Sequence, residues 1–138
     1  MRKTTLRGGP RCTNRQASPE KVTKAVCGDK MGELSEKACI PCRDGAEPLS
    51  PVESQKMVSL LNDHWALVEN HHLEREWSFP NFAEALAYVV ILGGICEEEG
   101  HHADFELSWG RVSAVIYTHK IDGLTESDFI LAAKFDNV

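Results

Sequence analysis

The sequence predicts an α+β two-layer sandwich in which helices pack on one face of a four-stranded antiparallel sheet. From residue 49 onward, apolar side chains recur in the order helix, strand, strand, helix, strand, strand, helix. Hairpins that alternate with helices favour an antiparallel sheet whose helices lie on one side. The chain has 138 residues, of which 42% are hydrophobic, and this length supports one core but not two.

The first expected helix follows Ser50, which can serve as its N-cap. Pro51 stands at the first helical position and Glu53 three residues after the cap, which is the spacing of a capping box. The helix is expected to end near residues 62–63, and its apolar positions are Val52, Met57, Leu60 and Leu61.

Two hairpins are expected, one on each side of the second helix. The first joins a strand over residues 65–68 to an alternating apolar and polar strand over residues 73–79, through a turn at residues 70–72. The second joins residues 105–109 to residues 111–118 through the single glycine between them.

Two further helices complete the pattern. Asn81 can cap a long helix that ends at Gly100, because glycine often stands just past a helix end, and Thr125 can cap the final helix. Apolar residues recur at helical spacing through both: Phe82, Ala85, Leu86, Val89, Val90, Leu92, Gly93 and Cys96 in the first, and Phe129, Ile130, Leu131, Ala132 and Phe135 in the second.

Charge divides the chain at about residue 30. Residues 1–30 carry eight Lys or Arg against two acidic residues, whereas residues 31–138 carry seven basic residues against nineteen acidic ones. We expect a disordered basic extension over residues 1–30, an irregular cysteine-containing segment over residues 31–48 and the folded domain over residues 49–138. The extension could serve organelle targeting, or it could precede an alternative start at Met31.

The acidic charge of the body bears on its partners. It makes direct binding to nucleic acid unexpected. No stretch of the sequence approaches the roughly 20 apolar residues of a membrane span. We therefore expect a cytoplasmic protein that contacts neither nucleic acid nor a membrane.

Five cysteines without a secretory signal do not favour a disulfide framework and point to a reducing compartment. Cys39 and Cys42 have the spacing of a zinc knuckle or a redox pair. A structural zinc site needs four ligands, and the chain has no second pair at this spacing. Two free thiols in a surface segment are the favoured interpretation, and Cys96 is interpreted as a small core residue.

A group of histidines and one carboxylate carries most of the functional information. Glu97 lies four residues before His101, so both are expected on one face of the helix, where the carboxylate can orient or charge the imidazole. The negative helix end favours imidazolium as well. His102 follows directly, and His119 at the end of the fourth strand can return toward this doublet. Because histidine titrates near neutral pH, the group predicts a proton-transfer site.

Two alternatives remain open from the residues alone. Glu97, His101 and His119 could bind a metal ion, although no ligand pattern such as HExxH is present. The histidines could also be structural. A second doublet, His71-His72, falls in a predicted hairpin turn and is expected to be solvent-exposed and inert.

The wider pattern around these residues is Glu97-x-x-x-His101-His102, then Trp109, Thr118-His119-x-x-x-Gly123-Leu124-Thr125-x-x-Asp128. It resembles the pterin-4a-carbinolamine dehydratase family, also called the 4a-hydroxytetrahydrobiopterin dehydratases, over about residues 47–138. The segments Cys39-Ile40-Pro41-Cys42 and Pro48-Leu49-Ser50 are similar to the N-terminal part of many bacterial members.

The resemblance implies the same sandwich fold and a hydro-lyase. The reaction would remove water from 4a-hydroxytetrahydrobiopterin, giving quinonoid dihydropterin, in tetrahydrobiopterin recycling beside aromatic amino acid hydroxylases. It implies no metal, no organic cofactor and a homodimer or homotetramer. Some members also act as dimerisation cofactors of transcription factors, so an oligomeric binding partner is the second hypothesis.

By position, the resemblance makes His101 and His119 the acid and base, with Glu97 as the carboxylate that opens the motif. Asp128 matches a supporting residue that caps or orients. The residues implied to contact the pterin are His101, His102, Ala103, Thr118, His119, Lys120 and Ile121. Ala103 replaces a proline that is usual in the family, and this should loosen the loop and lower the rate.

Overall fold

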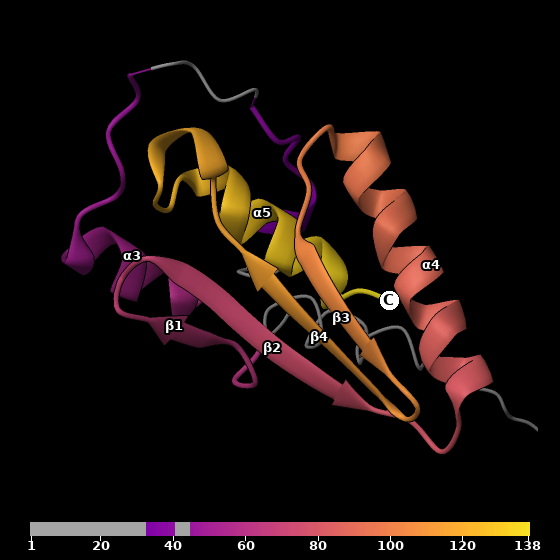
Figure 1. Ribbon diagram of the computed structural model, residues 1–138. Helices are drawn as coiled ribbons and strands as arrows, with labels where there is room; N and C mark the ends of the chain where they lie inside the picture. The colour runs from indigo at the N-terminus through magenta and orange to yellow at the C-terminus, as the bar shows by residue number, and fades with distance from the viewer. Residues whose placement is uncertain (1–32, 41–44) are drawn as a thin grey trace, which may run out of the picture. The chain divides into compact units, whose positions relative to one another are not determined.

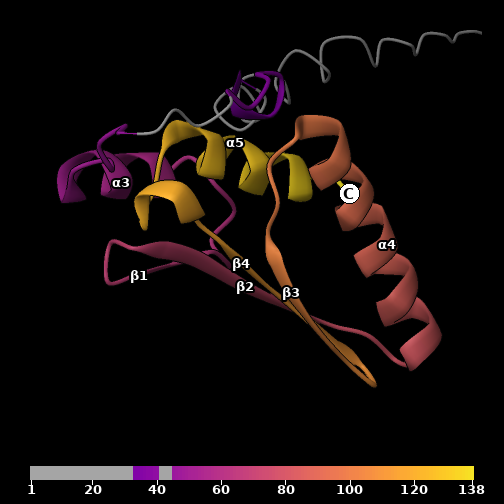
Figure 2. The same cartoon turned by 45° about the horizontal axis from the view of Figure 1, so that its top comes forward.

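A computed structural model of the chain describes residues 33–40 and 45–138. Its elements are α3 (Pro51–Val58), β1 (Ala66–Val68), β2 (His72–Ser78), α4 (Phe82–Glu99), β3 (Asp104–Ser108), β4 (Arg111–Ile116), the 3₁₀ helix η3 (His119–Ile121) and α5 (Glu126–Phe135). The strands form one antiparallel sheet in the order β1-β2-β4-β3. Figures 1 and 2 show α3, α4 and α5 on the same side of this sheet, which confirms the predicted α+β fold.

The capping box predicted at the start of α3 is present. The Glu53 N–H donates to Ser50 Oγ, and the Ser50 N–H donates to Glu53 Oε2. The helix ends at Val58, earlier than expected, because the next residues form tight turns that carry Leu61 into the core at 5% exposure. Val52 is 79% exposed and does not contribute to a buried apolar face.

Both predicted hairpins form. In the first, Glu69 and Asn70 have φ values of 48° and 55°, the left-handed conformation that suits a tight hairpin turn. His72 therefore belongs to β2, opposite Val68, rather than to the turn. The second hairpin turns at Trp109 and Gly110. A Cβ at Gly110 would lie 2.7 Å from the Phe79 carbonyl oxygen, so this position requires glycine.

Helix α4 has the expected ends, but its apolar residues divide between two environments. The Glu84 N–H donates to Asn81 Oδ1 at 2.9 Å, and Gly100 closes the helix at φ +64°. Some residues pack in or against the core and others are exposed to solvent. Ala85, Leu92 and Cys96 are fully buried and Tyr88 and Ile95 are partly buried, whereas Phe82, Leu86, Val90 and Ile91 are exposed.

Helix α5 is the centre of the core. Eight of its residues are buried, among them Phe129 and Phe135, and they pack beneath the sheet with Leu73 and Ile116. A capping box joins Thr125 to Asp128 at its start. Among the described residues, no helix is both long and apolar enough to cross a membrane. The predicted extension over residues 1–30 lies outside the described residues.

Candidate active site

The structure brings the three predicted histidines to one cavity of about 290 Å³. His101 and His102 follow the left-handed turn at Gly100 that ends α4, and His119 begins η3 after β4. The cavity is lined by all three imidazoles together with Thr118 and Lys120. Antiparallel pairing of β3 with β4 returns His119 to the loop that carries the doublet.

His101 is held by a buried carboxylate. Its Nε2 lies 2.7 Å from Asp128 Oδ1, and the two side chains are 13% and 0% exposed. The other carboxylate oxygen accepts from the Thr118 hydroxyl and from the Thr125 N–H, both at 2.8 Å. Asp128 is thus fixed by three partners. An imidazole that donates from Nε2 to this carboxylate keeps Nδ1 as its basic atom.

Glu97 does not contact His101 as expected. Its Oε1 lies 2.6 Å from His102 Nε2, and both side chains are largely exposed. The reason is the turn at Gly100, after which the His101 N–H donates to the Cys96 carbonyl and the chain leaves the helix. Helical i, i+4 geometry therefore ends before His101, which turns toward α5 instead.

His119 is the most open of the candidate acid and base groups. Its Nε2 lies 3.1 Å from Asp104 Oδ2, and both side chains are more than half exposed. Its ring packs against Tyr117 with centroids 4.2 Å apart. Because the ion pair faces solvent, it contributes little to stability, while the ring contact limits the orientations of the imidazole.

The second doublet is not the solvent-exposed pair that was expected. His71 and His72 side chains are 35% and 20% exposed. His71 packs on Tyr117, with centroids 4.9 Å apart, and pairs with Asp122 at 2.8 Å. Glu69 and Asn70 form the tight turn, so His71 follows that turn and His72 belongs to β2. Neither histidine of this doublet lines the cavity of about 290 Å³.

The remaining motif residues have different positions. Thr118 and Lys120 line the cavity, whereas Ala103 and Ile121 do not. Ala103 packs against the core. Burial raises the pKa of the Cys96 thiol, and a backbone hydrogen bond from Ala103 partly offsets this rise. Ala103 thus uses a backbone N–H that a proline at this position would lack.

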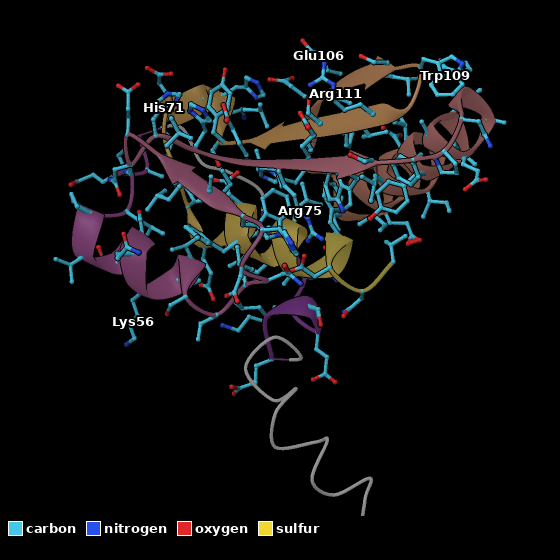
Figure 3. All side chains as sticks on the ribbon, turned by 90° about the horizontal axis from the view of Figure 1, so that it is seen from below. Lys56, His71, Arg75, Glu106, Trp109 and Arg111 are labelled. Atoms are coloured by element: carbon cyan, nitrogen blue, oxygen red, sulfur yellow. The ribbon has the colours of Figure 1, made fainter. Side chains whose placement is uncertain are left out.

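Trp109, which belongs to the quoted pattern, is remote from the cavity. It stands in the β3–β4 turn and is 68% exposed. Figure 3 places it at the opposite end of the sheet from His71. A molecule bound beside the histidines is therefore not expected to contact Trp109 of the same chain.

Three residues that the sequence did not assign to the site also line the cavity, namely Cys39, Ile40 and Glu99. Cys39 is partly buried, and its thiol lies 3.5 Å from the Ser127 carbonyl oxygen as a hydrogen-bond donor. Burial, with the charge of Glu99, raises its pKa to about 12. Cys39 is a free thiol, as expected, and it is partly buried. Cys42 lies outside the described residues.

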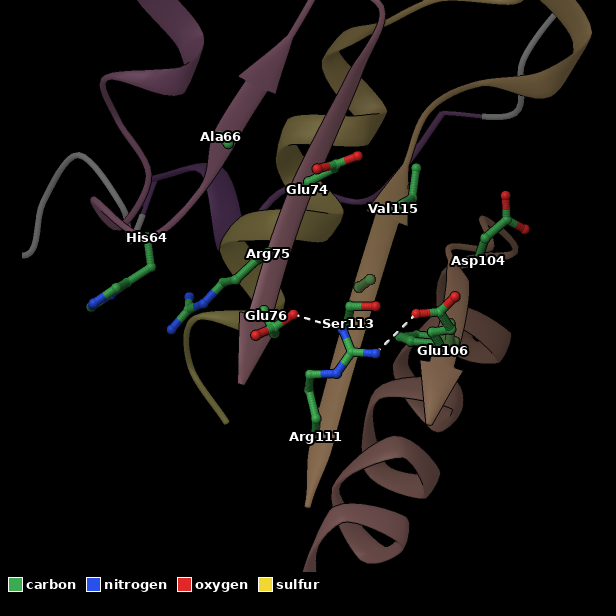
Figure 4. Close-up of a pocket in the computed structure, with 12 residues that line it drawn as sticks. His64, Ala66, Glu74, Arg75, Glu76, Asp104, Glu106, Arg111, Ser113 and Val115 are labelled. Atoms are coloured by element: carbon green, nitrogen blue, oxygen red, sulfur yellow. Dashed lines mark hydrogen bonds and ion pairs between the residues drawn. The ribbon is translucent and has the colours of Figure 1, made fainter. Parts of the chain in front are cut away.

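A larger cavity of about 560 Å³ lies on the open face of the sheet, away from the helices (Figure 4). Arg111 donates there to Glu76 at 2.7 Å and to Glu106 at 3.3 Å. The three predicted histidines do not line it. Size alone thus does not identify the site, and the convergent imidazoles favour the smaller cavity. Among residues 33–40 and 45–138, no group of three or more His, Cys, Asp or Glu is arranged to hold a metal ion.

Comparisons with known proteins show which family the chain resembles. Two relatives carry the name pterin-4-alpha-carbinolamine dehydratase. The one from Alkaliphilus metalliredigens is 53% identical over 106 residues, 77% of this chain and 96% of that protein. The one from Rubrobacter xylanophilus is 47% identical over 108 residues, 78% of this chain and 100% of that protein.

A solved structure shares the fold. It is described as a transcriptional coactivator/pterin dehydratase from Brucella melitensis, with a TM-score of 0.60 and 24% identity over 66% of this chain and 97% of that chain. The family model described as pterin 4 alpha carbinolamine dehydratase matches residues 47–138. The chain therefore belongs to the pterin 4 alpha carbinolamine dehydratase family, a family of hydro-lyases.

Proposed function

We propose that the chain dehydrates a 4a-hydroxytetrahydropterin to quinonoid dihydropterin by histidine acid–base catalysis. The observation that supports this most is the convergence of His101, His102 and His119 on one cavity, with His101 anchored to the buried Asp128. In the cell, the activity would serve tetrahydrobiopterin recycling beside aromatic amino acid hydroxylases.

The reaction needs two proton transfers. The C4a–O bond breaks as an acid protonates the departing hydroxyl, which leaves as water. A base takes the proton from N5, and the electron pair of the N–H bond forms the N5=C4a double bond. General acid and base groups near neutral pH accelerate such steps by about 10²–10⁴-fold each.

The three imidazoles differ in ways that suit different roles. His101 donates from Nε2 to Asp128, so its Nδ1 can accept the N5 proton. His119, which lies 3.1 Å from Asp104, is assigned as the acid that protonates the departing hydroxyl. His102 is paired with Glu97, both side chains being largely exposed, and would position the pterin ring. These assignments are part of the proposal.

The direct test is stopped-flow measurement of the decay of 4a-hydroxytetrahydropterin. The full chain should exceed the spontaneous rate, and His101→Ala or His119→Ala should each lower kcat by about 10²-fold or more. His64→Ala is the matched control, because His64 is an exposed histidine that does not line the histidine cavity. A wild-type rate equal to the spontaneous rate would refute the proposed function.

We propose self-association as a second role, and exposed apolar residues on α4 support it. Phe82, Leu86 and Val90 recur every four residues on α4 and are 44%, 43% and 65% exposed. Apolar residues at this spacing form one stripe along a helix. The neighbouring strand β3 is also an edge of the sheet. We propose that a second copy of the chain covers this stripe and forms a homodimer or homotetramer.

Light scattering coupled to gel filtration tests the assembly. Leu86→Asp should convert the oligomer to a monomer, whereas Val52→Asp should leave its mass unchanged. Val52 is the control because it is an exposed apolar residue on α3. If the wild-type chain is already a monomer at micromolar concentration, the assembly proposal is wrong.

A further inference from the structure

Residues 33–40 form a strap that reaches the histidine cavity from outside the matched family region. Leu34 anchors the strap in the core at 3% exposure. Lys37 pairs with Glu126 at 2.5 Å near the start of α5. The strap then continues to Cys39 and Ile40, which both line the cavity.

Hydrogen bonds to two helices fix the end of the strap. The Cys39 N–H donates to Glu99 Oε2 at 2.9 Å, and Glu99 is held in turn by Lys134 at 2.9 Å. The Ile40 N–H donates to Ser127 Oγ at 2.9 Å, and the same hydroxyl donates to the Ile40 carbonyl at 3.1 Å. This reciprocal pair fixes both backbone groups of Ile40 against α5.

The strap supplies the apolar part of the cavity. Ile40 is 63% exposed although its backbone is held on both sides. The rest of the lining is a glycine and polar or charged residues, namely Glu99, Gly100, His101, His102, Thr118, His119 and Lys120. Flat heterocycles bind best where one face meets hydrocarbon while the edges meet polar groups. In this cavity, only the strap offers hydrocarbon of that kind.

We infer that Ile40 packs against the ring face of the bound substrate and that the strap determines how tightly the pterin binds. This inference rests on the proposed function and deepens it, because it names a binding residue outside the histidine motif. Ile40 has no titratable group and takes no part in the proton transfers. It contributes equally to the ground state and the transition state, so its loss raises KM and leaves kcat unchanged.

Cys39 has a supporting part in this arrangement. Its thiol is partly buried and donates to the Ser127 carbonyl. Because burial and the Glu99 carboxylate raise its pKa, the sulfur stays protonated and is a poor nucleophile. Its role is to hold the strap rather than to react with the substrate.

The test compares Ile40→Ala with Ile40→Leu in the full chain. Ile40→Ala should raise KM by about tenfold with kcat within about twofold, and Ile40→Leu should stay close to wild type, because hydrocarbon is conserved. Val52→Ala is the matched control, since it shortens an exposed aliphatic side chain outside the cavity. An unchanged KM, or a fall in kcat at unchanged KM, would overturn the inference.

Ser127→Ala gives a second, independent variant. It removes the hydroxyl that holds both backbone groups of Ile40, while Ser127 itself does not line the cavity. KM should rise here too, by a smaller factor than in Ile40→Ala. An effect on thermal unfolding without an effect on KM would count against the strap as part of the binding site.

A binding measurement separates failure of this inference from failure of the proposed function. Fluorescence titration with 7,8-dihydrobiopterin, a stable pterin, reports binding without turnover. If the wild-type chain binds this pterin and Ile40→Ala weakens binding about tenfold, the role of Ile40 in binding is supported even when dehydration is absent. If dehydration is fast and Ile40→Ala binds the pterin as the wild type does, the proposed function stands and the role of Ile40 does not.

Discussion

Helix α5 carries two buried carboxylates, Asp128 at its start and Asp136 just past its end, and they have different surroundings. Both side chains are 0% exposed. Asp136 forms an ion pair with Arg75 and accepts from the Trp65 indole at 2.9 Å. Asp128 accepts from two threonines and contacts His101. The two acids are similarly buried, so burial does not distinguish them.

The difference lies in the basic partner. An arginine is a permanent cation in proteins, and the Arg75 guanidinium lies 4.8 Å from the Trp77 ring centre, between the sheet and α5 (Figure 3). Histidine is the side-chain type suited to proton transfer near neutral pH, and His101 borders the cavity. A buried acid with a permanent cation stabilises the fold. A buried acid with an imidazole at a cavity can also direct proton transfer.

The largest expected effect comes from Asp128→Asn. The amide oxygen can keep the two threonine donors, which places the NH₂ group against His101 Nε2 and forces the imidazole proton onto Nδ1. We expect kcat to fall by about 10²-fold or more with KM little changed.

Two further readouts sharpen that experiment. Nitrogen NMR of the His101 ring should show the change of tautomer directly, which a merely structural role for Asp128 would not produce. If kcat is retained, Asp128 is a structural acid like Asp136, and the contrast between the two ends of α5 does not hold.

Asp136→Asn should show the opposite pattern. It leaves the Arg75 guanidinium, 13% exposed, without a countercharge. Breaking a buried pair in this way costs about 3 kcal/mol of unfolding free energy. Urea unfolding should show this loss, while kcat per folded molecule stays within about twofold, because Asp136 does not line the cavity. Loss of activity without loss of stability would contradict the assignment.

The sequence predicted most of the fold because the signals are local. The Ser50 and Asn81 caps, the glycine after α4 and the alternation in β2 each report on neighbouring residues, and the structure confirms them. The expected Glu97–His101 contact was wrong for a local reason as well. Gly100 ends the helical geometry one residue too early for that pair.

The rest of the site depends on contacts between distant residues. Asp128 was predicted from the family resemblance, and it contacts His101 across 27 positions of the sequence. The bond between Cys39 and Glu99 spans 60 positions. No periodicity in a single sequence reports such pairs. Glu97 and Glu99 lie two positions apart in the sequence, yet they act separately, one on His102 and one on the strap.

The smallest expected effect concerns Glu99, a carboxylate at the cavity whose side chain is 15% exposed. The Cys39 N–H, followed by the Lys134 ammonium, lowers the pKa of Glu99 below its ordinary value. A carboxyl whose pKa is lowered in the folded state stabilises the fold at pH values above the ordinary carboxyl pKa, and this contribution is lost as the pH falls through the folded-state pKa.

Glu99→Gln should therefore cost about 1 kcal/mol of unfolding free energy at pH 7. In acid, where wild-type Glu99 is itself neutral, the two proteins should converge. Urea unfolding of both proteins from neutral to strongly acidic pH measures this. A constant gap across that range would mean that Glu99 holds the strap by shape rather than by charge, which would place it beside Asp136 as a structural acid.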